Sequence, residues 1–288
     1  MMQPSPTGSP ALAFDLGAET ARPATDRHVQ EVVALRHKRQ RAAIPWAARA
    51  AALAEKGPVS AKPFKTVHFI RHGQAVHNWL AAKLGAKKCG CKRSTPDGTD
   101  SPKADCPYNA PAAFDPPLTE EGREQAEKLM GVARGVQLIV SSPLRRTLQT
   151  ALHAFSGVDA PVIAHEDLRE QVGMHQCDRR RDTDAIRAEF GERVCLAGLR
   201  PADELWSLQR EPKDSVADRS TRFIQWLMER PEHEIAVTTH HHTLLVLFNC
   251  VLQTTTCTTT DSPMDGPSHD LCRPFEVGEM RSIRLCAL

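Results

Sequence analysis

The sequence predicts an α/β protein in which a mostly parallel central sheet is covered by helices on both faces. Short apolar runs rich in β-branched residues alternate along the chain with longer segments of helical periodicity. Strands that alternate with helices form parallel sheets buried beneath those helices. The chain of 288 residues, 41% of them hydrophobic, is long enough for one such domain with appendages. We therefore expect a three-layer α/β/α domain over 64–288, preceded by an N-terminal extension over 1–60.

The extension is expected to be partly disordered and partly helical. Residues 1–25 are rich in Pro, Ser, Thr, Gly and Ala without periodicity, which predicts a disordered leader. Residues 28–56 have a helical composition interrupted at Pro45. A solvated helix face is the favoured interpretation of the basic run in this segment, ahead of a nucleic-acid or localisation patch. The run consists of Arg36, His37, Lys38, Arg39 and Arg41.

From Phe64 onward the elements follow one another in the order that the alternating class requires. Apolar and β-branched runs predict strands at 66–70, 136–140, 161–164, 235–239 and 283–285. Amphipathic spacing predicts helices at 118–135, 215–230 and 243–252. A further helix is predicted to start at Ser141-Ser142-Pro143, and its buried side consists of Leu144, Leu148, Ala151 and Phe155. Residues 85–117 carry Gly, Pro, Asp, Ser and Lys with little periodicity, which predicts a long surface insertion.

Charge and cysteine usage argue against several classes of protein. A net charge of +2, from 37 basic and 35 acidic side chains, provides no general attraction for nucleic acid or a membrane surface, so we expect neither as a partner. No apolar run approaches the roughly 20 residues of a membrane span, and no secretory signal pattern opens the chain. We expect a cytoplasmic protein with reduced thiols, and an organelle address in the leader stays open. The oligomeric state is not readable from the sequence.

Basic side chains follow three of the predicted strands, at the point where each strand ends. Arg71 and His72 follow the first strand and His240 the last long one, while the second is followed by Ser142, Arg145 and Arg146. The carboxyl ends of parallel strands meet at one edge of a sheet, where ligands bind. Guanidinium and imidazole groups offer donors that match phosphate oxygens and stabilise the charge that shifts onto them during phosphoryl transfer. The sequence therefore predicts one anion pocket.

Four motifs in this order resemble the histidine phosphatase superfamily (branch 1), and the resemblance extends from about 64 to 285. They are Arg71-His72-Gly73-Gln74 with Asn78, Leu118-Thr119-Glu120-Glu121-Gly122, Ser142-Pro143-Leu144-Arg145-Arg146-Thr147 with Thr150-Ala151, and Thr239-His240. Three further segments are similar to the phosphoglycerate-mutase-like proteins of plants, algae and fungi: Leu168-Arg169-Glu170, the run from His175 to Arg181, and Glu279-Met280-Arg281-Ser282. The resemblance implies a phosphoglycerate-mutase-like fold.

The same resemblance implies a role for each matching residue. His72 would become phosphorylated, and Glu170 would be the proton donor. No metal or other cofactor is required, since arginines supply the positive charge. The residues that would hold the phosphoryl group are Arg71, Asn78, Arg146 and His240, and further candidate contacts with the substrate are His241 and Arg179.

Several of these assignments have rivals. Asp178 and Glu204 compete with Glu170 for the role of acid. Neighbouring residues on a helix point about 100° apart, so only one of Arg145 and Arg146 faces the pocket, and the family spacing selects Arg146. For the arginine run at 179–181, structural salt bridges and contact with an anionic group of the substrate both stay open.

Two groups of residues invite a metal interpretation that we do not favour. Three consecutive residues that cross from a strand to a helix rarely converge on one ion, which argues against a site at His240-His241-His242. Relatives usually have small residues after the pocket histidine, so the effect of His241 and His242 stays open. The spacing of Cys89, Cys91 and Cys106 is not a recognised zinc-finger pattern, and loop thiols are favoured there.

The favoured function is a phosphatase that hydrolyses small phosphate monoesters through a phosphohistidine intermediate on His72. A phosphoglycerate mutase is the first alternative, and the segment Gln171-Val172-Gly173-Met174 after Glu170 argues against it because it lacks the mutase-like pattern. A non-catalytic protein that binds a phosphorylated ligand is the second alternative. Degenerate relatives typically lose the nucleophile or a pocket arginine, and this chain retains them.

Overall fold

The structure is a computed structural model that describes residues 27–41, 49–52, 64–84, 105–254 and 271–286. The predicted leader at 1–25 lies outside these residues, as do Cys89 and Cys91 and the greater part of the predicted insertion. Within the described residues, no helix combines the length and the apolar character that crossing a membrane requires.

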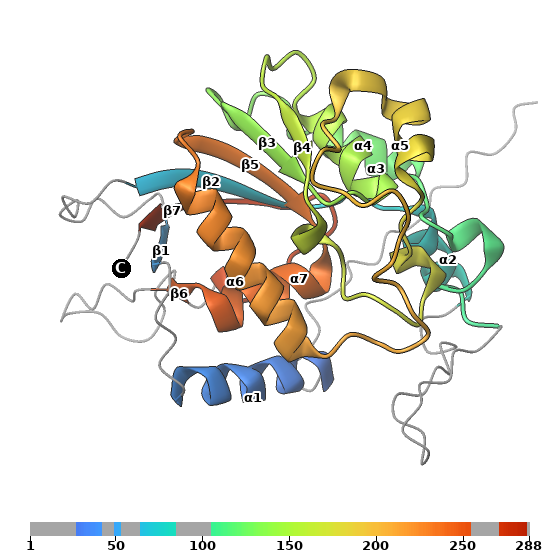
Figure 1. Cartoon of the computed structure of the whole chain (residues 1–288), viewed down its shortest axis with the longest axis horizontal. Helices are drawn as coiled ribbons and strands as arrows, with labels where there is room; N and C mark the ends of the chain where they lie inside the picture. The colour runs from blue at the N-terminus through green and yellow to red at the C-terminus, as the bar shows by residue number, and fades with distance from the viewer. Residues whose placement is uncertain (1–26, 42–48, 53–63, 85–104, 255–270, 287–288) are drawn as a thin grey trace, which may run out of the picture.

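A seven-stranded sheet runs through the centre of the molecule in the order β4-β3-β5-β2-β7-β1-β6 (Figure 1). Strands β4, β3, β5 and β2 are parallel neighbours, and β7 runs antiparallel to both β2 and β1. The expectation of a mostly parallel sheet is confirmed. The strands are β1 (Arg49–Ala52), β2 (Phe64–Arg71), β3 (Leu138–Ser141), β4 (Val162–Ala164), β5 (Glu234–Thr239), β6 (Gln253–Thr254) and β7 (Met280–Cys286).

Helices cover both faces of this sheet (Figure 1). One face of the sheet is covered by α1 (Arg27–Arg41), α6 (Lys213–Glu229), α7 (His241–Val246) and the π-helical turn η6 (Leu247–Val251). The other face is covered by α3 (Glu120–Glu127), α4 (Arg145–Ala154) and α5 (Thr183–Phe190). Successive side chains of a strand point to opposite faces, so Phe69 and Val237 enter the first core while Ile70 and Ala236 enter the second. The three-layer α/β/α class is confirmed.

The remaining helices are short and lie in the connections. They are α2 (Val76–Leu84), which follows β2, and the 3₁₀ turns η2 (Pro111–Ala113), η3 (Glu166–Leu168), η4 (Gln176–Asp178) and η5 (Gly191–Arg193). Helices α2 and α5 have no counterpart among the elements that the sequence predicted.

Two predicted helices have different bounds in the structure. The helix expected over 118–135 begins as predicted, with the Thr119 hydroxyl accepting a hydrogen bond from the Gly122 N–H, but it ends at Glu127. Gly131 has a φ of +73°, which a helix does not contain. The helix after β3 begins at Arg145, with Leu144 at its N-cap and no side-chain cap. The expected start at Ser141-Ser142-Pro143 is therefore too early. The Ser142 hydroxyl accepts from the Leu144 N–H over 3.4 Å and also lies 2.8 Å from Nε2 of His240.

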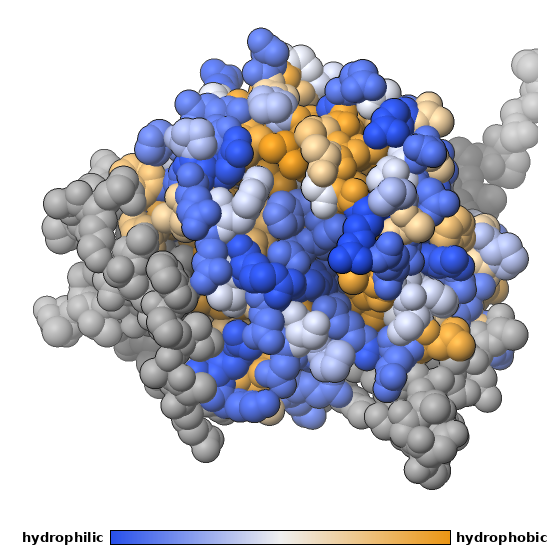
Figure 2. Space-filling view, viewed as in Figure 1, coloured by the Kyte–Doolittle hydropathy of each residue, from blue (hydrophilic) through white to orange (hydrophobic). Residues whose placement is uncertain are grey.

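The N-terminal extension packs against the domain. Helix α1 places Val32 and Leu35 in the core beneath the sheet, while Lys38 and Arg39 form ion pairs with Asp214 and Asp218 of α6. The surface over α1 and α6 is mostly hydrophilic (Figure 2), which supports the solvated-face interpretation of the basic run. The helical interpretation fails at 49–52, where the chain forms β1 because backbone pairing with β7 overrides composition. The boundary between extension and domain stays a prediction.

The described end of the predicted insertion is partly buried and not wholly at the surface. Cys106, Ala113 and Asp115 are buried. The Asp115 carboxylate accepts hydrogen bonds from the Arg145 N–H and the Arg181 side chain. These contacts attach residues 105–117 to the start of α4, close to the predicted pocket.

Two glycines allow the turn after β2 to lie directly against the first turn of α3. A Cβ atom on Gly73 would lie 2.3 Å from the Gly122 carbonyl oxygen, and one on Gly122 would lie 2.0 Å from the Gln74 carbonyl oxygen. Both obstacles are backbone atoms, so a side chain at either position forces the two segments apart. The predicted Arg-His-Gly tripeptide is thus held in place by the second predicted motif.

We expect Gly122→Ala to destabilise the protein by about 2 kcal/mol, because the added methyl group overpacks this contact. Displacement of the turn after β2 should also lower any activity that depends on His72. The matched control is Gly198→Ala, since a Cβ at the exposed Gly198 meets no atom within 4 Å. Denaturant unfolding of both variants checks the expectation, and equal stability of the two variants would contradict it.

Candidate active site

Side chains from the carboxyl ends of β2 and β5 and from the start of α4 converge at one point. His72 is 2% exposed, and its ring centroid lies 5.1 Å from that of His240. Arg146 is 1% exposed and donates from Nε to Nε2 of His72 over 3.3 Å. The structure thus brings together three of the residues on which the predicted pocket depends.

The hydrogen bonds of His72 fix which ring nitrogen is available for chemistry. Nδ1 lies 2.7 Å from the Gly73 carbonyl oxygen, an acceptor only, so Nδ1 carries the proton and Nε2 carries the lone pair. Burial, followed by the charges of Arg146 and Arg71, lowers the pKa of His72 well below its usual value of 6.5. A neutral imidazole whose unprotonated Nε2 lies beside a guanidinium is the form that a nucleophilic histidine requires.

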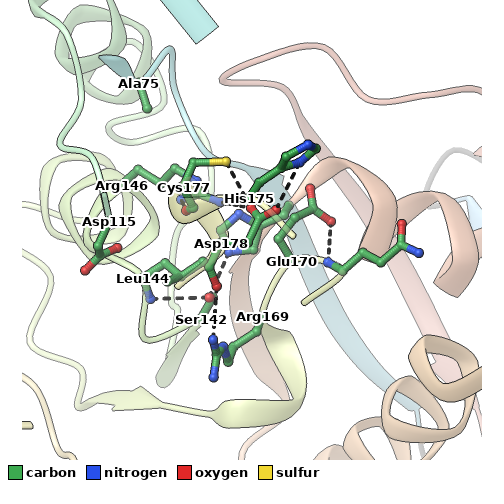
Figure 3. Close-up of polar contacts among 12 residues, drawn as sticks. Ala75, Asp115, Ser142, Leu144, Arg146, Arg169, Glu170, His175, Cys177 and Asp178 are labelled. Carbon is green, nitrogen blue, oxygen red and sulfur yellow. Dashed lines mark hydrogen bonds and ion pairs between the residues drawn. The ribbon is translucent and has the colours of Figure 1, made fainter. Parts of the chain in front are cut away.

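Arg146 is held by contacts on the side away from His72. Its Nη1 donates to the Cys177 carbonyl oxygen over 2.6 Å, and its Nη2 lies 3.3 Å from Oδ1 of Asp178. Figure 3 shows Arg146 and Cys177 on one side of Asp178 and Glu170 on the other. Arg145 points elsewhere and pairs with Glu189, as the spacing argument predicted.

His240 is fixed by a different strand end. Its Nε2 lies 2.8 Å from the Ser142 hydroxyl, which follows β3, and its Nδ1 is buried without a hydrogen-bond partner among the described residues. Burial, followed by the charges of Arg146 and His72, lowers the pKa of His240 well below 6.5. The ring is therefore neutral and its orientation is set by Ser142.

Glu170 lies at the same site, 7% exposed, with its carboxylate bound by backbone groups. The Gln171 N–H donates to Oε1 over 2.8 Å, and the His242 N–H donates to both carboxylate oxygens over 3.2 and 3.3 Å. Burial would raise the pKa of Glu170, but the neighbouring His242 and these hydrogen bonds hold it well below its usual value of 4.5. The carboxylate is ionised in this structure.

The two rivals of Glu170 are engaged in other contacts. Asp178 is buried between Arg146 and Arg210, which donates to its Oδ2 over 2.6 Å. Glu204 is exposed and pairs with Arg200. Glu170 therefore differs from both rivals, and its role as the acid stays a prediction.

Two predicted phosphate ligands, Arg71 and Asn78, form hydrogen bonds with backbone groups of the protein. Arg71 donates from Nη1 to the Phe275 carbonyl oxygen over 2.6 Å, and its charge contributes to the lowered pKa of His72. The side-chain oxygen Oδ1 of Asn78 accepts from the Ala75 N–H over 3.0 Å, at the start of α2. The phosphate contacts predicted for both residues stay predictions.

The two candidate substrate contacts, Arg179 and His241, pack against aromatic or imidazole rings. Arg179 is exposed, with its guanidinium 5.3 Å from the Trp206 ring centroid and 5.8 Å from that of Phe114. His241 packs its ring against His242 at 5.0 Å. The two neighbouring arginines serve structure, since Arg180 pairs with Glu166 and Arg181 with Asp115 and Glu189.

The sequence argument missed two components of the site. His77 is buried, its ring centroid lies 5.8 Å from that of His72, and its pKa is lowered well below 6.5 by burial and then by Arg146. His77 lies five residues after His72, and this short spacing is a signal that could have placed both residues at one site. Arg210 is buried against Asp178. The sequence on either side of Arg210 has the character of an exposed segment, so it did not indicate that this residue belongs to the site.

One group of described residues has the geometry of a metal site but not the chemistry. Ligand atoms of His175, Cys177 and Asp178 lie within 4.8 Å of one another. Both oxygens of Asp178 accept hydrogen bonds from the cationic arginines 146 and 210, and burial raises the pKa of the Cys177 thiol well above its usual value. A protonated thiol and a carboxylate already neutralised by two guanidinium groups do not suit a divalent cation.

Comparison with known proteins places this geometry among phosphate-handling enzymes. The family model described as "Histidine phosphatase superfamily (branch 1)" matches residues 110–268. "Phosphoglycerate mutase-like protein 1" from Arabidopsis thaliana is 30% identical over 224 residues, which cover 64% of this chain and 72% of that protein. "Probable phosphoglycerate mutase" from Arthroderma benhamiae is 28% identical over 240 residues, which cover 72% of this chain and 68% of that protein.

Among solved structures, a putative alpha-ribazole-5'-P phosphatase from Escherichia coli aligns with 78% of this chain and 94% of its own length. The TM-score is 0.45 and the sequence identity is 19%.

Proposed function

Because the chain belongs to the histidine phosphatase superfamily (branch 1), we propose that it is a phosphatase which hydrolyses small phosphate monoesters through a phosphohistidine on His72. The observation that carries the proposal is the state of His72: Nδ1 donates to the Gly73 carbonyl oxygen, while Nε2 faces the guanidinium of Arg146. That arrangement offers a lone pair to a phosphorus atom and a cation to its oxygens.

In the first step, Nε2 of His72 attacks phosphorus, the nitrogen–phosphorus bond forms, and the bond from phosphorus to the ester oxygen breaks. Arg71, Arg146 and His240 hold the three phosphoryl oxygens as charge spreads over them. The departing alkoxide is a poor leaving group, so it takes a proton from Glu170. His72 keeps its Nδ1 proton and its hydrogen bond to Gly73 throughout.

In the second step, water attacks the phosphohistidine from the side that the alcohol has left. Glu170, now a carboxylate again, takes a proton from that water, the nitrogen–phosphorus bond breaks, and inorganic phosphate departs. The ionised state of Glu170 in the empty site suits this step. No metal enters the proposed mechanism, since guanidinium groups stabilise the transferred charge.

A phosphoglycerate mutase is the second candidate, because the names of the relatives from Arabidopsis thaliana and Arthroderma benhamiae contain that activity. A mutase excludes water while the phosphorylated intermediate reorients on the enzyme. The two functions share the first step and differ in the acceptor of the phosphoryl group.

The test is a phosphate-release screen with sugar phosphates, nucleoside monophosphates, inositol phosphates and 3-phosphoglycerate. We expect at least one monoester to be hydrolysed with kcat/KM of about 10⁴ M⁻¹s⁻¹ or more, the range of ordinary enzymes. The 3-phosphoglycerate arm is run with and without a bisphosphate primer. Fast isomerisation without free phosphate would favour the mutase, and tight phosphate binding without any turnover would favour a binding protein.

A further inference from the structure

A histidine that the mechanism above does not use contacts the Glu170 carboxylate. His242 donates its backbone N–H to both oxygens of Glu170, and its Nδ1 lies 3.5 Å from Oε2. The His242 side chain is 20% exposed and that of Glu170 is 9% exposed. The backbone contact therefore fixes the carboxylate, and the side-chain contact places a titratable ring between Glu170 and solvent.

The other charged and titratable groups around Glu170 come from several elements. Burial competes with all of them, yet His242 is the largest influence that keeps the carboxylate ionised. Arg219 of α6 donates to the Glu170 backbone carbonyl oxygen and pairs its own charge with Glu211. The remaining groups that interact electrostatically with Glu170 are His72, His77, Arg210 and His240.

The proposed first step does not say where Glu170 obtains the proton that it gives to the leaving group. Glu170 has to donate a proton to the departing alkoxide, but its carboxylate is ionised in the empty site. The imidazoles of His72, His77 and His240 are buried and neutral because burial and Arg146 oppose their protonation. Those three rings therefore do not supply the proton. His242 is partly exposed and within ion-pair distance of the carboxylate, so it can exchange protons with both solvent and Glu170.

We propose that His242 is a positioning residue that stores the leaving-group proton and passes it to the departing oxygen through the Glu170 carboxylate. This inference rests on the phosphatase mechanism proposed above. In this inference, the pair of His242 and Glu170 protonates the leaving group, which a single carboxylic acid would otherwise do.

The number of protons held by His242 and Glu170 is the same before and after one turnover. In the first step, protonated His242 gives its proton to the ionised Glu170 carboxylate, which passes that proton to the alkoxide, so the alcohol leaves and His242 becomes neutral. In the second step, attacking water gives a proton to Glu170, which returns it to His242 as phosphate is released from His72. His242 begins and ends the cycle protonated, and no other acid is consumed.

Leaving groups of different basicity separate this role from a purely structural one. The glycerol alkoxide of a glycerol phosphate cannot depart without a proton, whereas p-nitrophenolate departs without one. We expect His242→Gln, which keeps the backbone contact and a polar side chain but does not titrate, to lower kcat on glycerol 2-phosphate by about 100-fold. With p-nitrophenyl phosphate the loss should be less than about threefold.

The pH profile gives a second readout. In the wild type, kcat for the alkyl ester should fall as the pH rises, because the proton for the alkoxide must be present on the enzyme before the leaving group departs. In His242→Gln this limb should disappear or move to lower pH, because protonated Glu170 alone must then act as the acid. Added imidazole should restore part of the alkyl-ester activity in His242→Ala.

The matched control is His153→Gln, since His153 also lies near a glutamate, Glu127 at 3.3 Å, but at the far end of α4. It should match the wild type on both esters. Equal losses on both esters in His242→Gln, or no loss on either, would overturn the inference while the phosphatase proposal stands. Failure of the wild type to release phosphate from either ester would overturn the phosphatase proposal itself.

Discussion

His72→Ala is expected to lower kcat/KM for phosphate release by at least about 10⁴-fold, because it removes the atom to which the phosphoryl group is transferred. Every other group in the pocket would remain, so residual turnover can come only from direct attack of water on a bound ester. Phosphate binding should survive, since Arg71, Arg146 and His240 are intact and the pocket gains room.

The measurement is steady-state phosphate release on the best substrate of the screen, with inorganic phosphate binding by calorimetry as the check on folding. His68→Ala serves as the control for loss of a buried histidine, since His68 lies on β2 but bonds to Ser282 and Glu234 at the opposite end of the strand from the pocket. It should cost stability and leave kcat near the wild-type value in the folded fraction. Wild-type turnover by His72→Ala would rule out the proposed nucleophile.

Arg146→Leu is expected to lower kcat by about 10³-fold, the effect of removing one preorganised charge from a transition state. The guanidinium touches Nε2 of His72 in the empty site, so it lies where the phosphoryl oxygens must sit. The substitution also leaves Asp178 with one arginine partner, Arg210, in place of two, and some loss of stability should accompany the loss of activity. Arg146→Lys should recover little, because a lysine cannot reach His72, Cys177 and Asp178 together.

Arg145→Leu is the matched control for that prediction. Arg145 is the preceding residue on the same helix, half-exposed and paired with Glu189. A loss of less than about threefold in kcat is expected. Comparable losses in the two leucine variants would mean that the charge of α4, and not the contact of Arg146 with His72, is what matters.

The sequence was a good guide to the fold where hydrophobic pattern decides structure. Strands β2, β3 and β5 each contain a short run of mostly buried apolar and β-branched residues, so their positions follow from the hydrophobic pattern. The predictions failed where tertiary contacts decide. Backbone pairing with β7 converts 49–52 into a strand, and a positive φ at Gly131 follows the early end of α3.

The candidate site shows the same division. His72, Arg146 and His240 follow from strand ends and helix spacing, since parallel topology brings those positions to one edge. The partners that hold them do not follow, because Asp178, Arg210 and His77 reach the site through irregular connections whose paths have no periodic signal. The histidine pair after β5 was left open in the sequence, and only the structure places His242 against Glu170.

The most direct test of the account is rapid acid-free quenching of the wild type with a ³²P-labelled monoester during the first turnover. Phosphohistidine is stable in alkali and labile in acid, so the label on the protein can be told from phosphoserine or phosphothreonine. The account predicts labelled protein that is chased by water to inorganic phosphate, with the label on His72 and none in His72→Ala. Turnover without any acid-labile label on the protein, or with the label on another residue, would contradict it.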